Sequence, residues 1–175
     1  MADFVAAFDK TVRRWESFEL TDAPGDYGRM TYAGISRRSW PGWVGWGAVD
    51  AGKPVPESMV RDFYREQFWD AIEGDALRHQ DVAEIIFDWA VNAGVPKAVF
   101  MVLDVLGLPS TLGMMAALRE LNNLAMPRLF VCEYALRRID YRVRRVERDE
   151  TQLKWLRGWL ERDLFFALGA GDGRA

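Results

Sequence analysis

Glu16 is the residue whose type and position best suit acid chemistry. It follows Trp15 and precedes Phe18, where an apolar helix is expected to end and a polar loop to begin. Partial burial against apolar groups favours the protonated form of a carboxyl group, so a glutamate in such a place can donate a proton in glycoside cleavage. On position alone, a solvated glutamate at a helix end is the more frequent case.

The loop after Glu16 offers partners for such an acid. Glu19, Asp22 and Asp26 are candidate second carboxylates, and the Thr31 hydroxyl could orient a water molecule. Inverting glycosidases hold their two carboxyl groups about 6.5–9.5 Å apart, and retaining ones about 5–5.5 Å apart. Sequence spacing leaves both courses open, and Asp and Thr also favour turns for purely local reasons.

Other polar and aromatic groups could contact a sugar. Asp88 and Asn92 are four residues apart, so they share a helix face. They could bond a sugar or tie down a neighbouring loop. Trp40, Trp43 and Trp46 could be stacking platforms or a packed aromatic lid over the core.

Composition excludes several classes of chemistry. The net charge of -3 shows no basic excess, which argues against a dedicated nucleic-acid binder. Cys132 is the single cysteine, so a disulfide framework and a cysteine zinc site are excluded. The single histidine, His79, is expected at the surface without a catalytic role, and we expect no metal and no cofactor.

A basic stripe occupies residues 137–148. Such a run is usually a solvated helix face, and it could also meet an anionic surface such as a wall polymer. Its members are Arg137, Arg138, Arg142, Arg144, Arg145 and Arg148.

The apolar spacing predicts a mainly α chain that positions these groups. Asp3 can cap a first helix that runs to about Phe18. Residues 19–34 predict a loop or short hairpin, and residues 40–56, rich in Gly, Pro and Trp, predict irregular structure. Further helices are expected over residues 59–68, 82–93, 99–106, 111–121, 127–148 and 152–168.

The segment from Glu16 to Ser36 is similar to the signature of glycoside hydrolase family 108, N-acetylmuramidases found among phage and prophage endolysins. In that register Glu16 takes the place of the catalytic glutamate, and Asp26, Thr31 and Gly34 also align. Three further segments resemble the family's motifs in the same order: Phe63–Asp70, Phe87–Gly94 and Leu156–Arg162. The resemblance therefore extends from about Phe4 to Leu168.

The resemblance implies a lysozyme-like fold and hydrolysis of the β-1,4 bond between N-acetylmuramic acid and N-acetylglucosamine. Glu16 would protonate the leaving oxygen. Asp26, Asp22 or a water held by Thr31 would act on the other face of the sugar. The residues expected to bind substrate are Asp22, Tyr32, Trp40, Tyr64, Asp88 and Asn92.

The chain departs from the family pattern beside the acid. Ser17 and Phe18 replace two glycines, which is expected to narrow the cleft or shift the loop. Ala33 stands where a tyrosine is usual, although Tyr32 is adjacent. We therefore expect these substitutions to affect substrate preference.

We expect residues 1–75 to form the catalytic part, residues 76–168 a helical peptidoglycan-binding-like part of the same compact unit, and residues 169–175 a flexible tail. The first 18 residues lack the apolar core of a signal peptide, and no apolar run reaches the about 20 residues of a membrane span. We expect a monomer made in the cytoplasm that acts in the periplasm or cell wall after release or export. The alternatives are a non-catalytic peptidoglycan-binding or structural protein of a phage-like particle, and a secreted antibacterial effector with the same chemistry.

Overall fold

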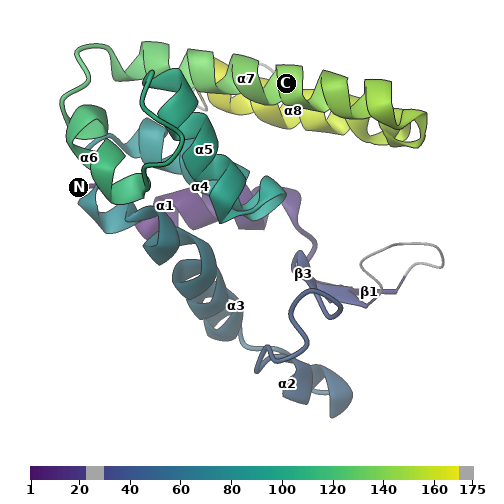
Figure 1. Cartoon of the computed structure of the whole chain (residues 1–175). Coiled ribbons are helices and arrows are strands. Elements are labelled where there is room, and N and C mark those ends of the chain that lie inside the picture. The colour runs from purple at the N-terminus through teal and green to yellow at the C-terminus, as the bar shows by residue number, and fades with distance from the viewer. Residues whose placement is uncertain (23–29, 170–175) are drawn as a thin grey trace.

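The computed structural model describes residues 1–22 and 30–169, and it is mainly helical with a small sheet, consistent with a lysozyme-like fold (Figure 1). The α-helices are α1 (Phe4–Phe8), α2 (Trp46–Asp50), α3 (Glu57–Tyr64), α4 (Gln80–Ala93), α5 (Val95–Val105), α6 (Met114–Asn122), α7 (Pro127–Arg148) and α8 (Leu153–Leu168). Shorter π-helical and 3₁₀-helical segments are Asp9–Arg13, Arg65–Trp69, Asp70–Ile72, Gly74–Ala76 and Glu150–Gln152. None of the described helices is both long and apolar enough to cross a bilayer.

Helix α4 is the centre of the core. Every residue from Val82 to Ala90 is buried, as expected for a helix surrounded by others. Helices α1, α5 and α7 pack against it. The aromatic rings of Phe4, Trp69 and Phe87 meet one another with centroids 5.6–6.0 Å apart, so side chains distant in sequence share this core.

The first helix is capped as predicted but is shorter and less regular. Asp3 accepts a hydrogen bond from the Val5 amide at 2.8 Å. Helix α1 then passes into the π-helical segment Asp9–Arg13, and helical structure ends at Trp15 instead of Phe18. The wider π turn is a local change that an apolar spacing pattern does not reveal.

A three-stranded antiparallel sheet follows, with strands β1 (Leu20–Thr21), β2 (Thr31–Tyr32) and β3 (Ile35–Ser36). Strands β1 and β2 lie within residues 19–34, the range predicted as a loop or short hairpin, and β3, beyond that range, completes a second hairpin with β2. Ala33 and Gly34 form its two-residue turn with φ values of 47° and 76°. Positive φ at both positions is the geometry that matches the twist of a hairpin.

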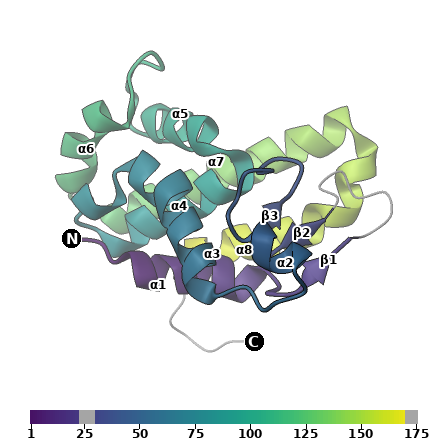
Figure 2. The ribbon, with the colours of Figure 1, turned by 90° about the horizontal axis from the view of Figure 1, so that it is seen from below.

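The remaining helices follow the predicted order, with shifted starts. Helix α7 has the predicted bounds, whereas α5 begins four residues earlier than predicted and α6 three residues later. The Trp-rich segment contains the short helix α2, so it is not irregular throughout. The sheet and α2 lie at one end of the molecule, away from α6, and α7 and α8 run side by side (Figures 1 and 2).

Candidate active site

Glu16 lies directly after the last helical residue of the first helix. Its amide still donates to the Val12 carbonyl oxygen at 2.8 Å. Its side chain keeps 25% of its surface exposed. The helix therefore fixes the backbone of Glu16, while solvent and solutes can reach the carboxylate.

The β2–β3 turn packs against this carboxylate. The Ala33 amide donates to the Ser17 carbonyl oxygen at 3.0 Å, which ties the turn to the residue after Glu16. A Cβ atom placed on Gly34 would lie 2.8 Å from Glu16 Oε2. Glycine is thus required at position 34 for two reasons: the positive φ, and the space that the Glu16 carboxylate occupies where a Cβ would be.

Tyr64, the last residue of α3, holds the β2–β3 turn through its hydroxyl group. Its hydroxyl donates to the Ala33 carbonyl oxygen at 2.8 Å, and it lies 2.6 Å from where a Cβ on Gly34 would be. Burial and then the charge of Glu16 raise the pKa of Tyr64 well above its usual value, against the opposing effect of Arg162. The phenol is therefore a neutral hydrogen-bond donor at any physiological pH.

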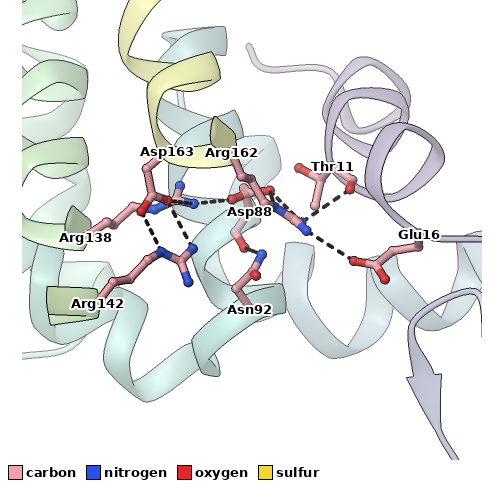
Figure 3. Close-up of polar contacts among 8 residues, drawn as sticks. All are labelled: Thr11, Glu16, Asp88, Asn92, Arg138, Arg142, Arg162 and Asp163. Carbon is pink, nitrogen blue, oxygen red and sulfur yellow. Dashed lines mark hydrogen bonds and ion pairs between the residues drawn. The ribbon is translucent and has the colours of Figure 1, made fainter. Parts of the chain in front are cut away.

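Arg162 of α8 reaches Glu16 from the opposite side. Its Nη1 lies 3.2 Å from Glu16 Oε1, and its Nε donates to Asp88 Oδ1 at 2.8 Å (Figure 3). Its Nη2 lies 3.4 Å from the Thr11 carbonyl oxygen, so three elements share one guanidinium. Burial lowers the pKa of Arg162, but attraction to Asp88 and Glu16 outweighs burial and leaves the pKa above its usual value.

A chain of alternating charges continues from Arg162 into the interior. Arg138 Nη2 lies 2.6 Å from both Asp88 Oδ2 and Asp163 Oδ1, and the Arg142 Nε lies 2.6 Å from Asp163 Oδ2. Both arginines also lie over the Trp89 ring, 5.0 and 4.9 Å from its centroid. We call Glu16, Arg162, Asp88, Arg138, Asp163 and Arg142 the buried charge network (Figure 3).

The network sets the charge state of its buried carboxylate at Asp88. Burial alone would raise the pKa of Asp88, but attraction to Arg162 and Arg138 outweighs it and lowers the pKa below the usual range. At Arg142, by contrast, burial lowers the pKa despite the bond to Asp163. Asp88 is therefore ionised at neutral pH and holds Arg162 in place.

Three of the predicted site residues lie at or near the hairpin. Thr31 and Tyr32 form β2, and the Tyr32 ring stacks on Trp43 with centroids 6.2 Å apart. Trp40 packs edge-on against Phe63, with centroids 5.0 Å apart, so it is part of the aromatic packing around α3.

The other predicted residues lie in different surroundings. Asp88 has no exposed surface and meets Glu16 only through Arg162, so it lies beneath the site and not on its surface. Asn92 donates to the Asp88 carbonyl oxygen at 2.9 Å, one turn away on the same helix. Asp22 is exposed and lines a cavity with Arg37, and Asp26 lies outside the described residues.

The sequence did not predict the buried positions of the three arginines in the charge network. The prediction of a solvated face is correct for four arginines of the basic stripe but wrong for Arg138 and Arg142, which are buried in the charge network. Arg162 was part of a recognised motif but was given no role. Arg138 and Arg142 are four residues apart on α7, so they share one helix face. This spacing is the feature of the sequence that could have indicated a common environment for the two.

Comparisons with known proteins give a family match and similar solved structures. Residues 10–94 match the model of the family described as Glycosyl hydrolase 108, a range that includes Glu16, the hairpin, Tyr64 and Asp88. Among solved structures, the structure of Brucella abortus SagA is 21% identical, with a TM-score of 0.63 over 95% of this chain and 97% of that one. This likeness shows a shared fold. No curated protein matches the chain.

Proposed function

Because residues 10–94 match the glycosyl hydrolase 108 family model, we propose that the protein is a muramidase of bacterial peptidoglycan. The bond cleaved is the β-1,4 link between N-acetylmuramic acid and N-acetylglucosamine. The family supports a glycosidase with peptidoglycan as substrate, and the choice of bond and of acid is our proposal.

One observation carries the proposal. The Glu16 carboxylate is partly exposed and is held between two fixed groups, with Arg162 at Oε1 and the Gly34 turn against Oε2. In the described part of the chain, no donor bonds Oε2. That oxygen is therefore the one that can carry a proton to the glycosidic oxygen of a bound glycan.

The reaction needs a group on the other face of the sugar. As Glu16 gives its proton, the bond from the anomeric carbon to the leaving oxygen breaks, and a nucleophile must form the new bond. Thr31, in the strand next to the Gly34 turn, would hold a water molecule there. Asp22 and Asp26 remain the carboxylate candidates for activating it or for acting directly.

Substrate contacts are expected along the hairpin and the Trp-rich segment, through Tyr32 and Trp40, whereas the predicted contact at Tyr64 is wrong because that side chain is buried beneath the turn. Asp88 and Asn92 would act indirectly. Asp88 would hold Arg162 in place, and Asn92 would bond the α4 backbone. The site of action we propose is the periplasm or cell wall, reached after release or export. A phage endolysin and a secreted effector would share this chemistry.

The decisive experiment compares the wild type with Glu16→Gln. Lysis of permeabilised Gram-negative cells is followed by turbidity, and the digested peptidoglycan is examined by mass spectrometry for its reducing-end sugar. Loss of a general acid costs about 10²–10⁴-fold in rate, and the wild-type products should end in N-acetylmuramic acid. Thermal unfolding of both proteins checks that Glu16→Gln is folded.

A second candidate is a peptidoglycan-binding protein without hydrolysis. The ion pair between Glu16 and Arg162 favours it, because such a pair can tie the first helix to α8 without taking part in any chemistry. Sedimentation with purified peptidoglycan measures binding, and comparison with the hydrolysis assay distinguishes the two candidate functions. Equal hydrolysis by both proteins would refute the role of Glu16, whereas binding without hydrolysis by either would establish the second candidate.

A further inference from the structure

A cavity of about 430 Å³ lies between the Trp-rich segment and α3 with its π-helical extension. Trp40 and Trp43 line it from one side, and Asp62, Phe63 and Glu66 from the other. We call it the tryptophan cavity. None of these residues except Trp40 was assigned to the proposed active site.

The aromatic walls of the cavity are fixed by one another. The ring of Trp40 meets Phe63 edge-on at 5.0 Å between centroids, and Trp43 meets the same ring at 6.1 Å. The Trp43 indole also donates to the Met59 carbonyl oxygen at 3.4 Å. Trp43 and Phe63 are 7% and 8% exposed, so the half-buried Trp40 supplies most of the aromatic surface open to a ligand, and its packing on Phe63 lowers the cost of side-chain ordering on binding.

Two carboxylates share the rim without a cation. Asp62 and Glu66 are four residues apart and exposed, an arrangement in which like charges repel on a helix. The neighbouring arginines pair with other acids: Arg61 with Glu57, and Arg65 with Asp70 and Asp75. Among the described residues, no lysine or arginine forms an ion pair with Asp62 or Glu66.

We propose that the tryptophan cavity binds a primary ammonium group carried on an aliphatic arm or a sugar ring. Aromatic faces attract cations and pack against the carbons beside them, and carboxylates make short, charge-assisted bonds to ammonium protons. If the protein is a muramidase, such a group has two sources in the wall. One is the side-chain amine of a diamino acid in the stem peptide, and the other is a glucosamine without its acetyl group.

The cavity adjoins the candidate active site through α3. Phe63 forms the cavity wall, and its ring lies 5.4 Å from that of Tyr64, whose hydroxyl supports the turn beside Glu16. An ammonium group held in the cavity would thus position its glycan or peptide alongside the acid. Loss of this ammonium contact is expected to raise KM and leave kcat nearly unchanged, because the contact stabilises the bound substrate and the transition state equally.

Binding is tested first without any turnover. The indole N–H signals of Trp40 and Trp43, assigned with single Trp→Phe variants, are followed by NMR during titration with Nα-acetyl-lysine amide. The Nα,Nε-diacetyl compound serves as the neutral control. Glucosamine tetramer is compared with its N-acetylated form to distinguish the sugar source from the peptide source. We expect both indole signals to shift with at least one of the two amines and with neither acetylated compound.

The variant Asp62→Asn/Glu66→Gln removes both carboxylates, and Glu120→Gln/Glu133→Gln removes two exposed charges elsewhere. The first should weaken amine binding at least fivefold, and the second should leave it unchanged. Equal binding of acetylated probes, no binding of either amine, or full binding by Asp62→Asn/Glu66→Gln would each overturn the proposal.

The same titration on Glu16→Gln separates this proposal from the proposed function. Ammonium binding should persist in that variant, because Glu16 is not part of the cavity. Amine binding by a protein that hydrolyses nothing would refute the muramidase and leave the cavity assignment standing. In an active protein, acetylating the amines of the peptidoglycan should raise the wild-type KM and leave that of Asp62→Asn/Glu66→Gln unaffected.

Discussion

Substitution of Gly34 by alanine tests whether the hairpin turn positions Glu16. The added Cβ would lie 2.6 Å from the Tyr64 hydroxyl and 2.8 Å from Glu16 Oε2, both too close. Tyr64 is rigid and bonded to Ala33, whereas the end of a glutamate side chain can rotate. We therefore expect Glu16 to give way, so that the substitution displaces the proposed acid.

The cost in stability comes from two terms. A φ of 76° at a residue with a Cβ costs about 1–2 kcal/mol. Crowding against Tyr64 adds about 1–3 kcal/mol. The sum, about 2–5 kcal/mol, corresponds to a fall in Tm of about 4–20 °C for a chain of this size.

The assays are thermal unfolding by circular dichroism and peptidoglycan hydrolysis below the Tm of the variant. Activity of the folded variant should fall about 100-fold, since a shift of about 1 Å in a catalytic group has that effect. Ala33→Gly is the matched control in the same turn, where a glycine relieves the positive φ. In Gly34→Ala/Tyr64→Phe, part of the stability should return while activity stays low. A Gly34→Ala protein with the wild-type Tm and rate would refute the packing of this turn against Glu16.

Two further predictions concern the buried charge network. Arg162→Met leaves Asp88 without one of its cations and should lower the free energy of unfolding by about 3–5 kcal/mol in urea titrations, with a smaller loss for Arg162→Lys; equal stability of Arg162→Met and wild type would contradict the network. Burial raises the pKa of Asp88, but Arg162 and Arg138 lower it below its usual 3.8, so its stabilising contribution is complete above about pH 4 and is lost as the pH falls through the lowered pKa. Urea midpoints between pH 7 and pH 3 should therefore fall less steeply for Asp88→Asn than for wild type, and parallel curves would exclude this origin of acid sensitivity.

The long helices were predictable because their apolar spacing and end signals agree. Pro127 begins α7 and fits the first turn of a helix, and Gly94 ends α4 with a φ of 92°. The sheet was not predictable in full, because strands of two residues are too short to show alternation. Glu16 and its turn could be proposed from motif order, since neighbouring residues in sequence build them.

The residues of the charge network that come from distant segments could not be predicted from local sequence patterns. Arg138 and Arg142 look like part of a solvated stripe, because burial of an arginine depends on acids that other helices supply. Arg162 belongs to a motif, but its contact with Glu16 spans 146 positions of sequence. Only tertiary packing brings such groups together, so local patterns predict the acid and not what holds it.

The contact between Glu16 and Arg162 also orders events during synthesis. A ribosome that has just added Glu16 must add 146 more residues before the arginine exists. The segment that matches the family model, residues 10–94, is complete long before then. Contacts between distant positions form late, because a long loop must first close. A nascent chain therefore carries an unfinished site through most of its elongation, and Glu16 gains its fixed partner only when α8 docks.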